Sequence, residues 1–197
     1  MDITRRRFLE YAGAVVVGGS TISIPAEAEA VENGFPKYWN YHQTSVTIPE
    51  KLDRREELYK LPENELFARM LFGEARGESP AERIIIGFTP SNRVNSDKFP
   101  EDTTLKAALL RQGQYSCFNE NDGNIKKVLN PLGYESFYVW ERCFECAQNH
   151  LNGEYKIGNV GQTNYHAKNM DSFPEWSEKM KKVGGLPKYF KHEFYVA

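Results

Sequence analysis

Apolar residues recur at helical spacing in several stretches of the chain. The first stretch runs through 66–71 and follows acidic residues that suit the positive end of a helix. We expect this helix to be capped near Asn64 and to stop at about Gly77 in a left-handed conformation. A second helix is predicted from Pro80 onward, with Pro90 kinking or ending it.

Two further helices and a pair of strands follow. A short helix is expected after a cap at Thr103 or Thr104, and the longest from about Glu135 to 150–151, just before Gly153. Alternating aromatic residues near the C-terminal end predict a small antiparallel pair. Its strands are 163–166 and 192–196. The predicted fold class is α+β, mostly helical, with strands gathered toward the end.

Composition, charge and length restrict the class of protein and the number of domains. The chain has 197 residues, a formal net charge of −2 and 40% hydrophobic residues. These values are typical of a soluble globular protein and lack the positive field of a general nucleic-acid binder. The length suits one domain, which we place at 61–197, preceded by an arm or linker at 31–60.

The first thirty residues have the pattern of an export signal. Arginines at 5–7 precede a short apolar run rich in Gly and Ala, and the paired arginines resemble the twin-arginine motif. The run is about half of the ~20 residues that span a bilayer, so no permanent membrane span is expected. A signal at 1–30 implies an exported protein, located in the periplasm, the cell wall or outside the cell. The alternative is an N-terminal helix.

Glu74 is the strongest candidate for chemistry. It follows Leu66 and Met70 by eight and four positions, so it projects from the same apolar face near the helix end. Burial and the negative helix pole both favour the protonated carboxyl, which an acid catalyst requires. The plainer alternative is that Glu74 and Arg76 simply pair.

Five short motifs appear in order along the domain. They are GEARGE at 73–78, NRV at 92–94, GQYSC at 113–117, GQTNYHA at 161–167 and HEFY at 192–195. Together they resemble the SleB-type cell-wall hydrolases, the family of spore cortex-lytic enzymes. Asn164 departs from the family pattern, which has His there, and Pro90 interrupts a helix that the family runs smoothly into NRV.

The resemblance implies a lysozyme-like fold and cleavage of peptidoglycan glycan strands. It implies a lytic transglycosylase that cuts between N-acetylmuramic acid and N-acetylglucosamine, with Glu74 as acid and then base. Peptidoglycan is then the partner, the protein is expected to be a monomer, and no cofactor or metal is needed. The alternative is a glycan-binding module that kept the cleft without catalysis.

Six residues are candidates for binding substrate. Polar or aromatic side chains in the motif loops, and a tryptophan between the strands, suit contacts with sugar hydroxyls or stacking on sugar rings. These are Gln114, Tyr115, Ser116, Tyr165, His166 and Trp176. For the aromatic and histidine side chains among them, packing in the core is the alternative. A second catalytic carboxylate, if the enzyme hydrolyses, has four candidates. These are Asp97, Asp102, Asp122 and Asp171.

The three cysteines leave alternatives open. Cys143 and Cys146 fall inside the longest predicted helix, where a zinc site of the finger type is not expected, although a metal-dependent hydrolase remains a third hypothesis. Buried free thiols are the default. A bridge from Cys117 to either of the other two after export is the alternative.

Overall fold

The computed structural model describes residues 31–32, 35–36, 46–155 and 158–197. The predicted export signal and most of the first half of the arm lie outside these residues. The helical elements are η1 (Arg55–Lys60), α2 (Glu63–Ala75), α3 (Pro80–Val94), α4 (Leu105–Leu110), η2 (Ser116–Phe118), α5 (Ile125–Leu129), η3 (Pro131–Gly133), α6 (Phe137–Leu151) and α7 (Glu175–Lys179). The strands are β1 (Val31–Glu32), β2 (Phe35–Pro36), β3 (Asn164–Ala167), β4 (Lys181–Lys182) and β5 (His192–Val196).

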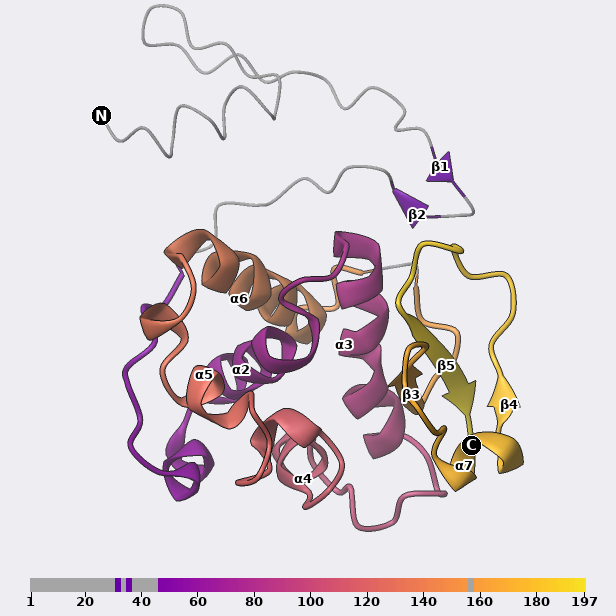
Figure 1. Ribbon diagram of the computed structural model, residues 1–197, viewed down its shortest axis with the longest axis horizontal. Helices are drawn as coiled ribbons and strands as arrows, with labels where there is room; N and C mark the ends of the chain where they lie inside the picture. The colour runs from indigo at the N-terminus through magenta and orange to yellow at the C-terminus, as the bar shows by residue number, and fades with distance from the viewer. Residues whose placement is uncertain (1–30, 33–34, 37–45, 156–157) are drawn as a thin grey trace, which may run out of the picture.

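Helix α2 lies at the centre of the helical part. It packs along α6 and is also contacted by α3, α4 and α5, as Figure 1 shows. Phe67, Met70 and Leu71 are fully buried on it, and Trp140 of α6 is fully buried beside them. The apolar period of the sequence therefore predicted the core helix correctly. None of the helices in the described ranges is long and apolar enough to cross a membrane.

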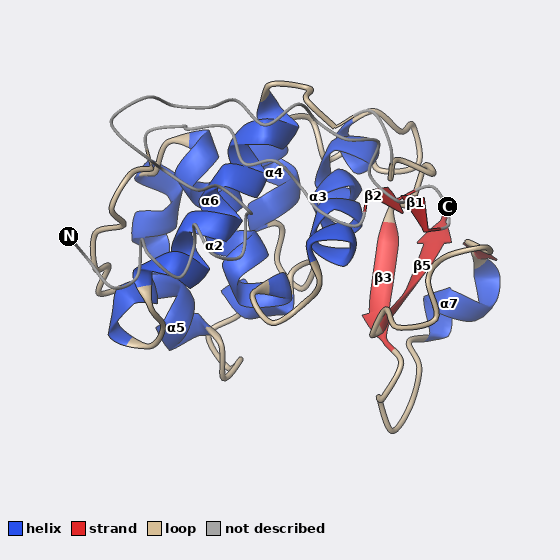
Figure 2. Cartoon of the chain, turned by 90° about the horizontal axis from the view of Figure 1, so that it is seen from above, coloured by secondary structure: helices blue, strands red, loops and turns tan. Residues whose placement is uncertain are grey.

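The sheet stands beside α3, at the opposite side of the domain from α6 (Figure 2). Strand β5 lies in the middle and pairs antiparallel with β3 and β4. Tyr165 is opposite Phe194, and His166 is opposite Glu193. The predicted antiparallel pair and the mostly helical α+β class are thus confirmed. The two-residue strand β4 was not predicted, because its Lys181 and Lys182 carry no alternating apolar pattern.

Helix boundaries agree with the predictions at the start of α3 and the end of α6, but differ at both caps of α2. Thr104, one of the two predicted caps, caps α4 by accepting a hydrogen bond from the Ala107 amide. The cap of α2 is Pro62 rather than Asn64, and its C-cap, Arg76, is right-handed. The predicted left-handed stop at Gly77 is wrong, because Gly77 has no positive φ. Side chains, rather than a glycine, satisfy the carbonyls at this end, as shown below.

Pro90 does not end α3, which was one of the two predicted effects of this proline. The helix runs from Pro80 to Val94 through it. A proline removes the amide that would bond to the carbonyl four residues earlier, which here belongs to Ile86. The buried Thr89 hydroxyl donates to that carbonyl at 2.7 Å and so replaces the missing bond. The threonine before the proline therefore lets the helix continue.

Replacing Thr89 by the isosteric Val should destabilise the protein by about 1–3 kcal/mol, because the buried Ile86 carbonyl would lose its donor. Urea unfolding measures this. Thr103→Val, at an exposed position, is the matched control and should stay within about 0.5 kcal/mol of the parent. Equal effects of the two substitutions would contradict the role of the Thr89 hydroxyl.

His150, near the end of α6, sits in an aromatic cluster. Its ring contacts Phe67, Phe88 and Tyr155 at centroid distances of 5.5, 4.5 and 4.6 Å. A Cβ at Gly87 would lie 2.1 Å from its Nε2 atom, so only glycine fits there. Burial lowers the pKa of His150 to about 3. The imidazole is therefore neutral in the folded protein.

This histidine makes stability fall on acidification. The unfolded chain takes up a proton near pH 6.5 and the folded chain only near pH 3, so stability is lost as the pH falls between these values. We expect the stability advantage over His150→Leu to shrink by up to about 1.4 kcal/mol per pH unit below pH 6. Burial raises the pKa of Glu145 to about 7, so this residue makes stability rise on acidification. Glu145 is present in both proteins, so its contribution cancels in their difference. Urea titrations at several pH values test this, and a constant difference would refute it.

Candidate active site

Glu74 lies in the last turn of α2 and is held from two other elements. Its Oε1 accepts a hydrogen bond from the Cys117 amide of η2 at 3.0 Å. Its Oε2 accepts one from the Tyr165 hydroxyl of β3, also at 3.0 Å. A helix, a loop and the sheet thus meet at this carboxyl, and both of its donors are uncharged.

Gly73 allows the loop to come this close. A Cβ at this position would lie 2.4 Å from the Cβ of Cys117 and 2.9 Å from a methyl group of Val128. Such separations do not occur between real side chains, so any larger residue would push η2 away from α2. The glycine before Glu74 therefore places the Cys117 amide within reach of the carboxyl.

Two arginines close the end of α2. The last carbonyls of a helix have no partner within it and need donors from elsewhere. Arg76 donates to the carbonyls of Phe72 and Gly73, both at 3.2 Å. The buried Arg83 of α3 donates to the carbonyls of Ala75 and Glu78 at 3.2 and 3.1 Å. The helix can thus end directly after Glu74 without a left-handed residue.

A cleft of about 380 Å³ opens beside Glu74. Eight residues line it: Gly73, Glu74, Arg76, Gly77, Glu78, Asn124, Glu135 and Val139. The other two carboxylates of the lining are ion-paired, Glu135 with Arg76 at 3.5 Å and Glu78 with Lys191 at 3.0 Å. Arg76 also donates to the Asn124 side chain at 3.0 Å. Glu74 is therefore the one carboxyl of this lining whose contacts in the structure are with uncharged donors.

Both neighbouring side chains keep their protons. Burial, and to a smaller extent the nearby Glu74 carboxylate, raises the pKa of Tyr165 well above its usual value. The same two causes raise the pKa of the Cys117 thiol. The Tyr165 hydroxyl is consequently a permanent donor to Glu74, and Cys117 is not a thiolate nucleophile.

The residues of the motif loop at 113–117 differ in how deeply they are buried. Gln114 is half-buried and Ser116 is exposed. Tyr115 is buried, its hydroxyl lies 3.3 Å from that of Thr89, and burial raises its pKa above the usual range. None of the loop residues that we proposed for substrate binding lines the cleft. The loop contributes the backbone amide of Cys117, which donates to Glu74.

The strand residues divide between the two faces of the sheet. Tyr165 points to Glu74, while its neighbour His166 points to the other face, as the alternation of a strand requires. There the His166 ring stacks on Phe173 and Tyr195 at centroid distances of 4.6 and 5.3 Å, and it contacts Trp176 at 5.9 Å. His166 and Trp176 are therefore brought together, but away from Glu74.

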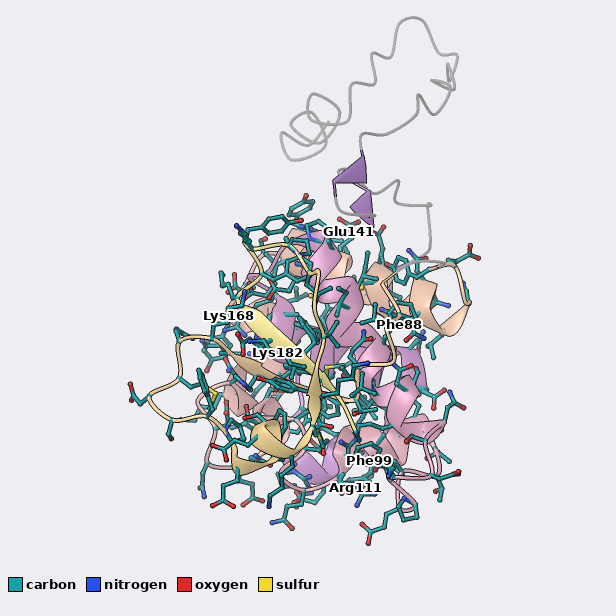
Figure 3. All side chains as sticks on the ribbon, turned by 90° about the vertical axis from the view of Figure 1, so that its right-hand side faces the viewer. Phe88, Phe99, Arg111, Glu141, Lys168 and Lys182 are labelled. Atoms are coloured by element: carbon teal, nitrogen blue, oxygen red, sulfur yellow. The ribbon has the colours of Figure 1, made fainter. Side chains whose placement is uncertain are left out.

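Of the four aspartates considered as a second carboxylate, none lines the cleft. Asp102 is buried between Arg93 and Arg111, at 2.8 and 2.5 Å, and Arg93 covers the ring of Phe99. Figure 3 shows Phe99 and Arg111 together at one end of the domain. The two carboxylates that do share the cleft with Glu74 were not predicted to do so. Glu135 was expected only at a helix start. Glu78 belongs to the GEARGE motif, which was the available signal for it.

Comparison with known proteins adds no assignment. No family model, curated protein or solved structure matches this chain. The three cysteines are buried free thiols, Cys143 and Cys146 on the core side of α6 and Cys117 beside Glu74. In the described part of the chain, no three His, Cys, Asp or Glu side chains are grouped to hold a metal ion.

Tyr165→Phe should reduce stability by about 0.5–1.5 kcal/mol, because the variant lacks the hydroxyl that Glu74 accepts from. A double-mutant cycle with Glu74→Ala isolates the contact, and we expect the two effects to be non-additive by a similar amount. Tyr134→Phe, at an exposed position, is the control and should add independently to Glu74→Ala. Additivity in both cycles would show that the Tyr165 contact contributes nothing in solution.

Proposed function

We propose that the chain is an exported SleB-type cell-wall enzyme with a lysozyme-like fold, which cleaves peptidoglycan glycan strands as a lytic transglycosylase. One observation supports this most. Glu74 faces a cleft from a helix end, and uncharged donors fix both of its oxygens. An acid catalyst needs a carboxyl in a fixed place beside the substrate and without a permanent cationic partner.

The proposed reaction uses one carboxyl twice. Protonated Glu74 gives its proton to the oxygen that links N-acetylmuramic acid to N-acetylglucosamine, and the bond from the anomeric carbon to that oxygen breaks. The C6 hydroxyl of the muramic residue then attacks this carbon. The Glu74 carboxylate takes the hydroxyl proton as the 1,6-anhydro ring closes. Proton, leaving group and new bond are balanced without any further reactant.

The residues around Glu74 position it for both steps. The Cys117 amide and the Tyr165 hydroxyl each occupy one acceptor site on a carboxyl oxygen, which leaves a further site on each oxygen for the substrate. Because the pKa of Tyr165 is raised, this hydroxyl keeps its own proton and does not act as the acid in place of Glu74. Its part is to orient the acid.

The transglycosylase route differs from hydrolysis in the number of carboxyl groups that it needs. A hydrolysing glycosidase uses a second carboxylate as nucleophile or base, roughly 5–9.5 Å from the first. Glu78 and Glu135 share the cleft, but each is ion-paired, with Lys191 and Arg76 respectively. An intramolecular hydroxyl nucleophile needs neither of them, so Glu74 alone suffices for the proposed route.

Glu74→Gln should lower the rate of peptidoglycan solubilisation by at least about 100-fold while preserving the fold, because glutamine cannot donate the proton. Turbidity of a cell-wall suspension measures the rate, and mass spectrometry of the products should find 1,6-anhydro ends with the wild-type protein. Glu120→Gln, at an exposed position outside the cleft, is the matched control and should keep full activity.

The same experiment separates the alternatives. Unchanged clearing by Glu74→Gln would refute the assignment of the acid. Products with ordinary reducing ends would identify a hydrolysing muramidase. Binding of walls by both proteins, without turnover by either, would identify a glycan-binding module.

A further inference from the structure

Exposed apolar side chains are concentrated in one short segment. The described part of the chain has eleven large hydrophobic residues with exposed side chains, and four of them fall within residues 132–138. These four are Leu132, Tyr134, Phe137 and Tyr138, exposed by 38, 52, 42 and 39% respectively. Single exposed apolar residues are ordinary, but a cluster of them marks a binding surface. We name these four side chains the aromatic rim.

The aromatic rim is continuous with the cleft. Glu135 lies between Tyr134 and Phe137 in the chain and lines the cleft, as does Val139, the residue after Tyr138. Glu135 lies just before Ser136, the residue that caps α6, and Phe137, Tyr138 and Val139 form the first turn of that helix. The rim residues therefore flank Glu135 and Val139, which line the cleft around the start of α6.

The backbone and the polar neighbours hold the rim rigid. Within η3 the amides of Gly133 and Tyr134 bond back to the carbonyls of Asn130 and Pro131 at 3.1 and 3.2 Å. The Asn130 side-chain amide lies against Gly133, 2.2 Å from where a Cβ would stand. Arg142 lies over the Tyr138 ring at 5.4 Å. Exposed aromatic rings on a pre-ordered backbone lose little entropy on binding, which suits recognition.

The cleft is too small to hold a long polysaccharide by itself. A volume of about 380 Å³ is near the lower end of the roughly 300–1,000 Å³ range of small-molecule pockets. A polysaccharide held at Glu74 must therefore continue beyond the cleft and across its border. The apolar faces of sugar rings pack on aromatic side chains, whereas their hydroxyls need the polar groups that the cleft supplies.

We infer that the aromatic rim is an extended binding subsite for a polysaccharide of N-acetylated sugars, in which Tyr134 and Tyr138 stack on sugar rings outside the cleft. This inference rests on the proposed function and adds to it. The protein then binds long glycan strands better than short ones. Loss of the rim weakens binding of the polymer and leaves recognition in the cleft unchanged.

The test uses the full chain with Glu74→Gln as a parent that binds without cutting. Its affinity is measured for purified peptidoglycan by sedimentation and for a chitin-derived disaccharide by NMR titration. We expect Tyr134→Ala with Tyr138→Ala to weaken polymer binding by about threefold to tenfold, the size of one or two ring contacts. Disaccharide binding should not change. Tyr134→Trp with Tyr138→Phe should retain polymer binding.

Two other exposed tyrosines supply the control. Tyr59 and Tyr189 are 50 and 57% exposed, on η1 and on the loop before β5. Replacing both by Ala should leave both affinities unchanged. Unaltered polymer binding in the rim variant, or equal losses for polymer and disaccharide, would overturn the inference while the parent still binds. A parent that binds no glycan, together with a wild type that cuts none, would instead overturn the proposed function and the rim with it.

Discussion

The buried carboxylate of Glu82 fastens the sheet to the helices, and the arrangement at Glu74 depends on it. Its Oε1 accepts hydrogen bonds from the amides of Lys191 and His192 at 2.7 and 2.8 Å and lies 2.9 Å from the His192 ring nitrogen. Glu82 stands in the first turn of α3, where the helix dipole favours a negative charge. Glu82 fixes the position of β5, and β3 pairs with β5. Tyr165 of β3 is therefore placed within hydrogen-bond distance of Glu74.

A second set of contacts fixes β3 from the same helix. The Gln162 side chain donates to the carbonyl of Ile85 at 2.8 Å, and Asn92 donates to the backbone carbonyl of Gln162 at 2.8 Å. Helix α3 also supplies Arg83 to the end of α2. One helix therefore sets both the position of the carboxyl and the position of its hydroxyl donor. The continuity of α3 through Pro90 matters for this reason, since Asn92 lies beyond the proline.

Local patterns predicted what depends on local physics. The helical period predicted α2 and α6, the cap of α4 was narrowed to Thr103 or Thr104, and alternating aromatics predicted the β3–β5 pair. Three features depend on particular side-chain contacts instead of periodicity and were missed. Pro90 continues its helix because of a hydroxyl, α2 ends on arginines instead of Gly77, and Glu135 reaches the cleft through the fold. The Thr89 and Arg76 contacts span only three or four residues, but patterns of apolar positions do not register single hydrogen bonds. Only the place of Glu135 beside Glu74 depends on residues far apart in the chain.

The split of the motif at 161–167 shows why matching letters does not settle which residues act. Adjacent strand residues face opposite ways, so Tyr165 and His166 cannot both point at Glu74. His166 bonds the Tyr195 hydroxyl at 2.9 Å, and that hydroxyl donates to Glu193 at 3.0 Å. This polar chain runs along the face that carries Trp176, on the side of the sheet away from Glu74. The histidine of the motif therefore holds the sheet together, and the tyrosine beside it reaches the carboxyl.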